Sequence, residues 1–135
     1  MIGGRAKVLG DASVGGRAKV GGDASVSEEA RISGEAEVFG RSMVSGGASV
    51  FGSAWVFEEA RVFGGALVFE DASVGGRAQV FGSAWIRGKA QVGGVAKIGG
   101  TAVLLGGVWD GSPEGGGEEV LSGTWLAPGK RIPLE

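Results

Sequence analysis

A six-residue repeat runs through most of this 135-residue chain and constrains its fold more than any other feature. Every sixth position from Ile2 to Leu104 is aliphatic. Two residues before these positions stands Ala, except at Ser42, and two residues after them stands Gly, except at Glu28, Glu58 and Glu70. The unit is Ala-x-Val-x-Gly-x, and its aliphatic positions are Ile2, Val8, Val14, Val20, Val26, Ile32, Val38, Val44, Val50, Val56, Val62, Val68, Val74, Val80, Ile86, Val92, Ile98 and Leu104.

This spacing predicts short strands separated by turns. The Ala and Val of each unit are two residues apart, so both face the same side of a strand. The Gly-x pair provides a turn with a positive φ angle, which glycine adopts without strain. A helix would need apolar residues three and four apart, which the repeat never offers. We therefore expect an all-β chain that turns a corner after every strand and closes a triangular coil of 18 residues.

The charges at the corners test this 18-residue period. Residues 18 apart would lie on successive coils, about 4.8 Å from each other, where opposite charges attract. Two corners alternate in sign, with one neutral step: they carry Arg5, Asp23, Arg41, Glu59 and Arg77, and Arg17, Glu35, Ser53, Asp71 and Lys89. The third does not alternate and carries Asp11, Glu29, Gly47, Gly65, Ser83 and Thr101. Two corners of three thus favour three strands per coil, and six coils would form a prism roughly 29 Å tall.

The repeat resembles the hexapeptide-repeat, left-handed parallel β-helix superfamily, which includes many acyltransferases. Its style is closest to phage and prophage Ala-x-Val-x-Gly proteins of unknown function, many of which end in Gly-Gly-Val-Trp-Asp-x-Ser-Pro. The segment Gly106-Gly107-Val108-Trp109-Asp110-Gly111-Ser112-Pro113 matches that ending. The resemblance implies a left-handed coil, although parallel crossovers are normally right-handed. The chain departs from these arrays in having no Asn in its turns, and in Glu28, Glu58 and Glu70, where a positive φ would cost about 1 kcal/mol each.

The composition excludes several classes of protein. A net charge of −2 gives no electrostatic case for binding nucleic acid or an anionic membrane. No apolar run reaches the length of a membrane span, and the first residues lack the apolar core of a signal peptide. We expect a cytoplasmic protein by default, or a virion-associated one if a phage encodes it. We expect residues 1–108 to form the β-helix and residues 109–135 a C-terminal loop and cap.

Large apolar side chains occupy outward positions in the middle and upper coils. Sorted by the 18-residue period they fall on three faces: Phe51, Leu67, Phe69 and Trp85, below Val103 and Leu105; Phe39, Trp55 and Phe57; and Met43, Phe63 and Phe81. Such side chains can stabilise the coil by contact between strands, or they can form an interface between copies. We favour an interface for the first face and leave both interpretations open for the other two. A homotrimer is expected from the habit of the superfamily, with a dimer second.

The two ends of the prism need separate explanations because a β-helix exposes strand edges and core unless it is capped. Residues 109–117 are expected to form a loop, after which apolar residues return as a cap. Pro128 and Pro133 are expected to exclude further regular pairing. The N-terminal coil is expected to stack on another chain or to leave an exposed edge. The candidate cap residues are Trp109, Val120, Leu121, Trp125 and Leu126.

The residue types present argue against catalysis. The chain has no His and no Cys, so the general base of hexapeptide acyltransferases and the usual zinc ligands are missing. Adjacent carboxylates at Glu28-Glu29, Glu58-Glu59 and Glu118-Glu119 suit solvated turns better than acid–base chemistry or Ca²⁺ binding. We therefore expect no catalytic residue, no metal and no cofactor.

Two functional hypotheses follow from this sequence. The first is a non-catalytic structural or interaction module, phage-derived, that acts through a rigid prism and its aromatic faces. The alternative is a degenerate transferase that binds an acyl or nucleotide-sugar ligand between neighbouring prisms. The absence of His favours the first.

Overall fold

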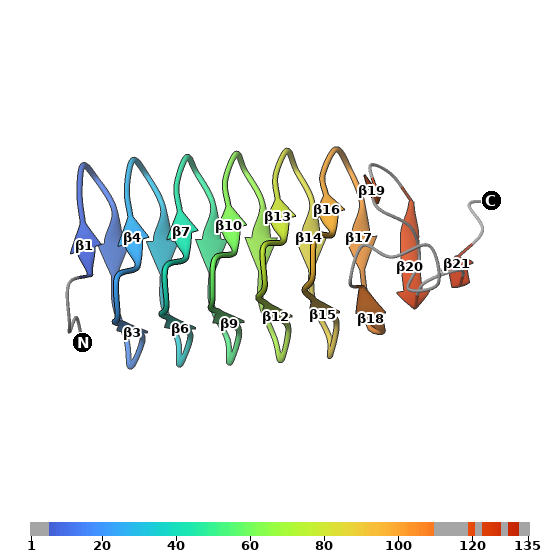
Figure 1. Cartoon of the computed structure of the whole chain (residues 1–135), viewed down its shortest axis with the longest axis horizontal. Coiled ribbons are helices and arrows are strands. Elements are labelled where there is room, and N and C mark those ends of the chain that lie inside the picture. The colour runs from blue at the N-terminus through green and yellow to red at the C-terminus, as the bar shows by residue number, and fades with distance from the viewer. Residues whose placement is uncertain (1–5, 110–118, 121–122, 128–129, 133–135) are drawn as a thin grey trace.

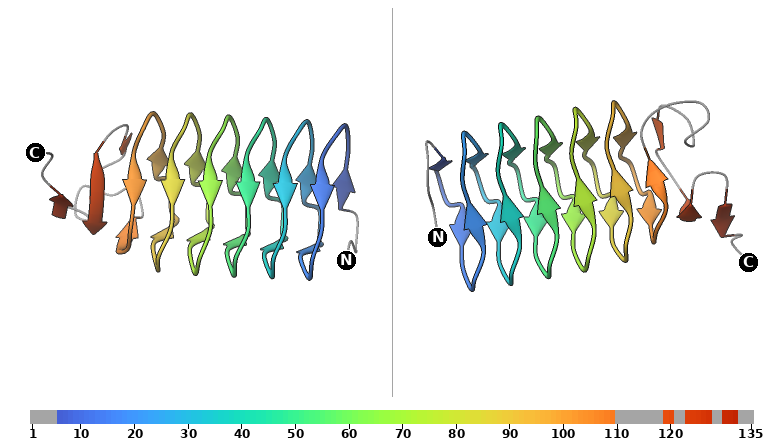
Figure 2. Two further views of the ribbon diagram at one scale, coloured as in Figure 1. Left: turned by 180° about the vertical axis from the view of Figure 1, so that it is seen from behind. Right: turned by 60° about the horizontal axis from the view of Figure 1, so that its bottom comes forward.

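The computed structural model describes residues 6–109, 119–120, 123–127 and 130–132, and these form a β-solenoid with three sheets, parallel except for the last strand of one sheet (Figures 1 and 2). The seven-stranded sheet contains β1 (Lys7–Val8), β4 (Ser25–Val26), β7 (Met43–Val44), β10 (Arg61–Val62), β13 (Gln79–Val80), β16 (Lys97–Ile98) and β19 (Glu119–Val120). The eight-stranded sheet contains β2 (Ser13–Val14), β5 (Arg31–Ile32), β8 (Ser49–Val50), β11 (Leu67–Val68), β14 (Trp85–Ile86), β17 (Val103–Leu104), β20 (Thr124–Ala127) and β21 (Lys130–Ile132). The six-stranded sheet contains β3 (Lys19–Val20), β6 (Glu37–Val38), β9 (Trp55–Val56), β12 (Ser73–Val74), β15 (Gln91–Val92) and β18 (Val108–Trp109). No helix occurs among the described residues, so none there could span a membrane.

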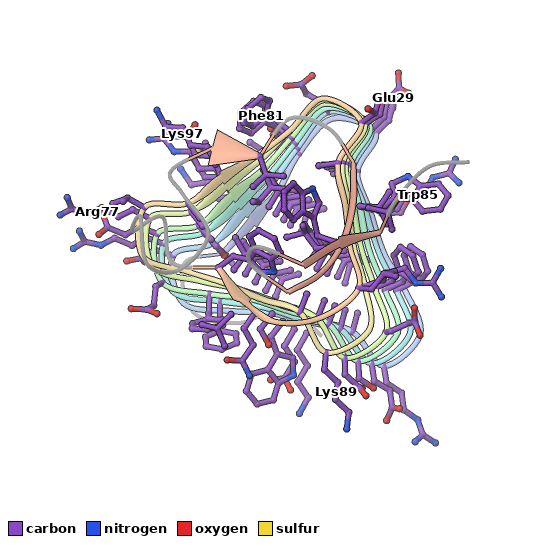
Figure 3. The ribbon with its side chains drawn as sticks, turned by 90° about the vertical axis from the view of Figure 1, so that its right-hand side faces the viewer. Glu29, Arg77, Phe81, Trp85, Lys89 and Lys97 are labelled. Atoms are coloured by element: carbon purple, nitrogen blue, oxygen red, sulfur yellow. The ribbon has the colours of Figure 1, made fainter. Side chains whose placement is uncertain are left out.

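The strand register confirms the 18-residue coil. Val8 pairs with Val26 and Val62 with Val80, so each strand lies beside the strand three units later in the chain. Viewed along the long axis, the stacked coils enclose a triangle whose corners are marked by Glu29, Arg77 and Lys89 (Figure 3). The predicted all-β, triangular solenoid of about six coils is therefore confirmed. The left-handed sense implied by the resemblance stays a prediction.

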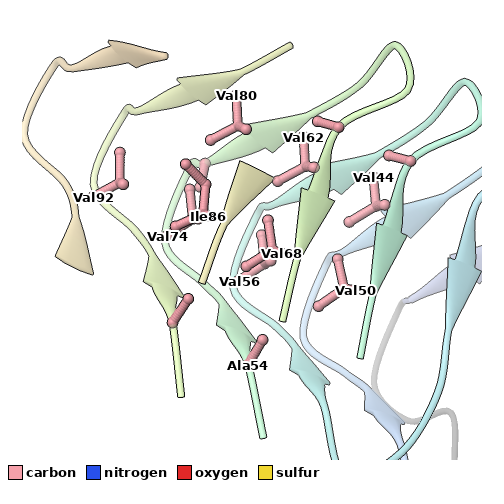
Figure 4. Close-up of a cluster of buried hydrophobic side chains, with 14 of the residues drawn as sticks. Val44, Val50, Ala54, Val56, Val62, Val68, Val74, Val80, Ile86 and Val92 are labelled. Carbon is pink, nitrogen blue, oxygen red and sulfur yellow. The ribbon is translucent and has the colours of Figure 1, made fainter. Parts of the chain in front are cut away.

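The Ala and Val of the repeat fill the inside of the triangle. From Ala18 to Leu104 these side chains are at most 2% exposed, and Figure 4 shows the stacked valines pointing inward from the three sheets. The one polar residue in the Ala column, Ser42, is also buried, and its hydroxyl donates a hydrogen bond to the carbonyl of Phe39 at 2.8 Å. A buried hydroxyl with a partner costs little, which explains why the repeat tolerates Ser here.

The turns explain the glycine that follows each strand. Gly40 has a φ of 72°, and a Cβ built on it would lie 2.7 Å from the backbone nitrogen of Glu58, one coil further on. Glycine is therefore favoured both by the left-handed backbone and by the close stacking of turns. Glu28, Glu58 and Glu70 adopt the same conformation with φ of 60°, 57° and 61°. The turns that contain glutamate thus keep the left-handed backbone conformation of the turns that contain glycine. This is expected if the neighbouring coils hold them in place.

The C-terminal end differs from the sequence-based expectation in two ways. Trp109 does not begin a loop: it is the second residue of β18, pairs with Val92 and fills a core position at 1% exposure. Its coil is one residue shorter than the others, because Gln91 pairs with Val108. The expectation that Pro128 and Pro133 exclude further pairing is also wrong, because β21 pairs antiparallel with β20. The prolines only flank β21 in the sequence, and an edge strand tolerates proline beyond its paired residues.

Three of the predicted cap residues lie at this end of the core, and their role as a cap stays a prediction. The rings of Trp109 and Trp125 meet edge to face, with centroids 5.7 Å apart, and Val120 is 6% exposed. Leu121 lies outside the described residues, and Leu126 belongs to β20. At the other end β1 and β2 are the first strands of their sheets, and the inward side chains of both strands are only half-buried. In the described part of the solenoid, two tryptophans therefore pack against each other at one end, whereas the core is half-exposed at the other.

Candidate functional site

The three groups of large side chains lie on three different sheets, as their spacing predicts. The first aromatic face, Phe51, Leu67, Phe69 and Trp85, lies on the eight-stranded sheet. The second aromatic face, Phe39, Trp55 and Phe57, lies on the six-stranded sheet. The third aromatic face, Met43, Phe63 and Phe81, lies on the seven-stranded sheet. In the view along the axis Trp85 and Phe81 point outward from two different sides of the triangle (Figure 3).

The first aromatic face is a continuous column of rings. Phe51 and Phe69 stack with centroids 5.0 Å apart and planes 3° from parallel, and Phe69 meets Trp85 edge to face at 6.1 Å. The guanidinium carbon of Arg87 lies 5.3 Å from the centroid of the Phe69 ring. The column therefore ends toward the C-terminus in a cation–π contact, which the sequence reasoning missed although Arg87 follows Phe69 by one 18-residue period.

These contacts leave part of the first face exposed. Phe51 and Phe69 are half-buried by their neighbours, whereas Trp85 remains 41% exposed. Val103, one coil above Trp85 in register, is half-buried and apolar as well. Both interpretations of the large residues thus have a physical basis here: the phenylalanines stabilise the stack, and Trp85 offers area to another molecule. The role of this face as an interface stays a prediction.

The second aromatic face has a different shape. Phe39 and Phe57 stack with centroids 5.6 Å apart, and Trp55 meets Phe39 edge to face at 6.3 Å. The ring of Phe57 lies over Gly75, where a Cβ would come within 2.5 Å of it. Trp55 itself is 46% exposed. The result is a ridge of aromatic side chains in the middle of the six-stranded sheet, with smaller residues on both sides.

A hollow lies on each side of this ridge. Toward the C-terminus, a groove of about 600 Å³ is lined by Trp55, Phe57, Glu58, Ser73, Gly75, Gly76, Gln91, Val92, Gly93, Gly94, Val108 and Trp109. Toward the N-terminus, a charged hollow of about 330 Å³ is lined by Arg17, Lys19, Glu35, Glu37, Ser53 and Trp55. Trp55 belongs to both. The sequence reasoning did not find these hollows, although the change from large to small residues every 18 positions is visible in it.

The third aromatic face repeats the stacking of the second. Phe63 and Phe81 stack with centroids 5.6 Å apart, and the ring of Phe81 covers Gly99, which is buried beneath it. Met43 is 43% exposed. A column of phenylalanines that ends on a glycine thus occurs on two of the three sheets, since the glycine lets the last ring lie flat on the next coil.

The predicted charge ladders are realised in one step. Nε of Arg77 lies 3.6 Å from Oε1 of Glu59, and both side chains are more than half exposed. No other step of the two ladders forms an ion pair within the described residues, and Arg5 lies outside them. An exposed pair of this kind contributes between 0 and about 1 kcal/mol. The strand pairing, and not these charges, confirms the register of the coils, and the ladders add little to its stability.

Two of the three glutamates in left-handed turns have side-chain partners. Oε1 of Glu58 accepts a hydrogen bond from the backbone nitrogen of Gly76 at 3.2 Å. Oε1 of Glu70 accepts one from Nε of Arg87 at 2.7 Å. Glu28 has no such partner among the described residues, and it lines a shallow acidic hollow with Asp11 and Glu29. Within the described residues no three acidic side chains gather closely enough to hold a metal ion.

Comparison of the chain with protein-family models, with curated proteins and with solved structures gave no significant match. The candidate function therefore depends on the surfaces described above. The surfaces that stand out are the exposed tryptophans, Trp85 on the eight-stranded sheet and Trp55 on the six-stranded sheet.

Proposed function

We propose that the protein is a non-catalytic structural or interaction module of the hexapeptide-repeat type, phage-derived, whose rigid solenoid self-associates through side chains of the first and third aromatic faces. The repeat and the segment Gly106–Pro113 support the family and the phage-like origin. The absence of His and Cys from the chain supports a non-catalytic role, because His is the commonest general base and Cys the most nucleophilic side chain, and the acyltransferases that the repeat resembles use a His base.

The observation that carries the proposal is the exposure of Trp85 within an apolar column. Leu67, Trp85 and Val103 occupy consecutive outward positions of the eight-stranded sheet, paired in register on β11, β14 and β17. Trp85 is 41% exposed, and no charged side chain interrupts the column across these three coils. A large, exposed aromatic side chain surrounded by apolar residues is a common anchor of protein interfaces.

The adjacent corner of the prism is also uncharged in these coils. The corner between the seven-stranded and eight-stranded sheets carries Gly47, Gly65 and Ser83. The other two corners are charged: one carries Glu59 and Arg77, and the other carries Asp71 and Lys89. The apolar surface thus continues around this corner toward Phe63 and Phe81. We call the strip formed by Phe63, Phe81, Leu67 and Trp85 the apolar corner. Arg61 and Lys97, exposed on the seven-stranded sheet, limit the strip to the corner itself.

The proposed occupant of the apolar corner is a second copy of the chain. Six coils give a face roughly 29 Å tall, and one side of a coil is about 15 Å wide, so one face offers about 450 Å². A stable pair of proteins usually buries about 800 Å² on each partner. In a cyclic trimer each protomer contacts two neighbours, one through the surface on each side of the apolar corner, so about 900 Å² of each protomer is buried over two contacts. The proposed assembly is therefore a homotrimer, with a dimer as the runner-up.

Sedimentation equilibrium at about 10 μM tests this assembly. The wild-type chain is expected at three times the chain mass, and Trp85→Lys is expected at the mass of one chain, because it buries a charge in the interface. Trp55→Lys is the matched control: Trp55 is similarly exposed, at 46%, but lies on the six-stranded sheet. It should leave the assembly intact. A monomeric wild type, or equal loss of assembly in both variants with unchanged circular dichroism, contradicts the proposal.

A further inference from the structure

We propose that the groove between Trp55 and Val108 on the six-stranded sheet, here called the Trp55 groove, binds a short neutral oligosaccharide. This site is separate from the apolar corner, because it lies on a sheet that the proposed trimer does not use. The inference goes beyond self-association and can hold or fail independently of it.

The shape of the groove follows from two columns that change from large to small. At the centre of the sheet Trp55 is followed in register by Ser73 and Gln91. At its edge Phe57 is followed after 18 and 36 residues by Gly75 and Gly93. Three coil steps separate Trp55 from Val108, which is about 14 Å at the spacing of parallel strands. The groove is therefore long enough for a chain of a few sugar rings and too open to enclose a small molecule.

The aromatic platform of the groove is Trp55. Its partner Phe57 stacks on Phe39 and lies over Gly75, so its ring faces are already covered. Trp55 meets Phe39 only through an edge-to-face contact and keeps 46% of its surface exposed. A single exposed indole offers a flat apolar surface with a polar N–H at its edge. This suits a ligand that is itself flat and amphipathic, such as a pyranose ring.

The polar groups around this platform include both donors and acceptors. The side chains of Ser73 and Gln91 make no hydrogen bond to any described residue, and the same holds for the backbone N–H of Gly94. The carboxylate of Glu58 is oriented by the N–H of Gly76 at 3.2 Å, which leaves its remaining lone pairs free. Hydroxyl groups both donate and accept, so a polyhydroxylated ligand can use all four groups at once.

The charge of the groove argues against other ligands. No Lys or Arg lines it, so a phosphate, a nucleotide or an acyl carrier with phosphate groups would find no cation there. Glu58 is its one charged lining residue, and a cation would be drawn to it. Strong binding of an organic cation, however, depends on aromatic faces that exclude water around it. Trp55 alone provides such a face, in an open groove, which favours a neutral ligand.

The experiment uses the full chain and four probes: maltohexaose, cellohexaose, chitohexaose and mannohexaose, with tetramethylammonium chloride as the cationic comparison. Isothermal titration calorimetry is expected to show binding of at least one hexasaccharide with a Kd of about 1 mM or tighter. Trp55→Ala is expected to weaken that binding at least tenfold. The chain also offers a matched pair of glycine variants, which change the shape of the surface without removing a polar group.

Gly93 and Gly21 occupy equivalent positions on the six-stranded sheet. At both, an added Cβ meets no atom within 4 Å, and neither has a positive φ. Gly93 lines the groove and Gly21 does not. Gly93→Leu should therefore abolish hexasaccharide binding, whereas Gly21→Leu should bind as the wild type does. The proposal is overturned by any of three results: no hexasaccharide binds at 10 mM concentration (about tenfold above the expected Kd), Gly93→Leu binds unchanged, or only tetramethylammonium binds.

Discussion

The three glutamates in left-handed turns allow the cost of a side chain in that conformation to be separated from the value of its charge. Each has a φ near 60°, where a residue with a Cβ loses roughly 1 kcal/mol relative to glycine. Replacing each glutamate with alanine removes the carboxylate and keeps the Cβ. Replacing each alanine with glycine then removes the Cβ alone. Two substitution steps at each of three sites therefore give six changes in the free energy of unfolding, and the structure predicts each of them.

The second step, from alanine to glycine, should stabilise the chain by about 1 kcal/mol at all three sites, because φ is the same. The first step should differ. At Glu58 and Glu70 it removes an accepted hydrogen bond, which the backbone N–H of Gly76 donates to Glu58 and Nε of Arg87 donates to Glu70. The loss should destabilise by about 0.5 kcal/mol, since both groups are partly exposed to solvent. At Glu28 it removes no bond to a described residue and relieves the repulsion from Asp11 and Glu29, so it should be neutral or slightly stabilising.

Thermal unfolding followed by far-UV circular dichroism is a suitable assay, together with urea unfolding at 25 °C. A change of 1 kcal/mol corresponds to a shift of about 3–5 °C in Tm for a chain of this size. Glu28→Gly should be the most stable of the six variants and Glu58→Ala and Glu70→Ala the least. Equal stability of the alanine and glycine variants at all three sites would refute the reasoning, because it would mean that φ is not constrained in these turns.

Two further predictions concern glycine and tryptophan positions. Gly75→Ala should destabilise the fold by about 1–3 kcal/mol, because its Cβ must displace the ring of Phe57. Gly93→Ala on the next coil should change stability by less than about 0.5 kcal/mol, because its Cβ meets no atom. Urea midpoints of the two variants check this, and equal midpoints would contradict it. Trp109→Ala should destabilise by about 3–5 kcal/mol, since it empties the largest fully buried position at the C-terminal end of the core; a loss below about 1 kcal/mol would show that Trp109 does not close that end.

The fold was predictable because one constraint repeats in every unit. Val and Ala two apart must face the same side, and glycine must turn the chain, so the spacing leads to a coil of short strands. The charge alternation every 18 residues then favours three strands per coil. The C-terminal end was not predictable in the same way, because there the repeat stops. Trp109 fills a core position through a coil one residue short, and β21 pairs between two prolines. Both depend on contacts with the last coils, which local propensity does not contain.

The candidate sites were only half predictable. The aromatic residues could be assigned to their sheets, since outward positions follow the same period as the core. The contacts among them could not, because the choice between a ring stacked on its neighbour and a ring left exposed depends on side-chain rotamers. Phe57 lies on Gly75 and is half-buried, while Trp55, two residues earlier, remains exposed. The groove results from this difference, and no single residue in the sequence marks it.

The separation between inside and outside explains how such a chain can carry distinct surfaces. From Ala18 to Leu104 the inward positions are nearly all Ala and Val, so these coils have the same backbone whatever their outward residues are. A column of outward residues can therefore change from large to small without moving the strands beneath it. On the six-stranded sheet this change from large to small produces the Trp55 groove. On the eight-stranded sheet the outward residues Leu67, Trp85 and Val103 are all apolar and none is small, so they form a raised apolar column. Exchanging Gly93 for a large residue should turn the groove into a column of the second kind, which is why that substitution tests the shape of the surface rather than the stability of the fold.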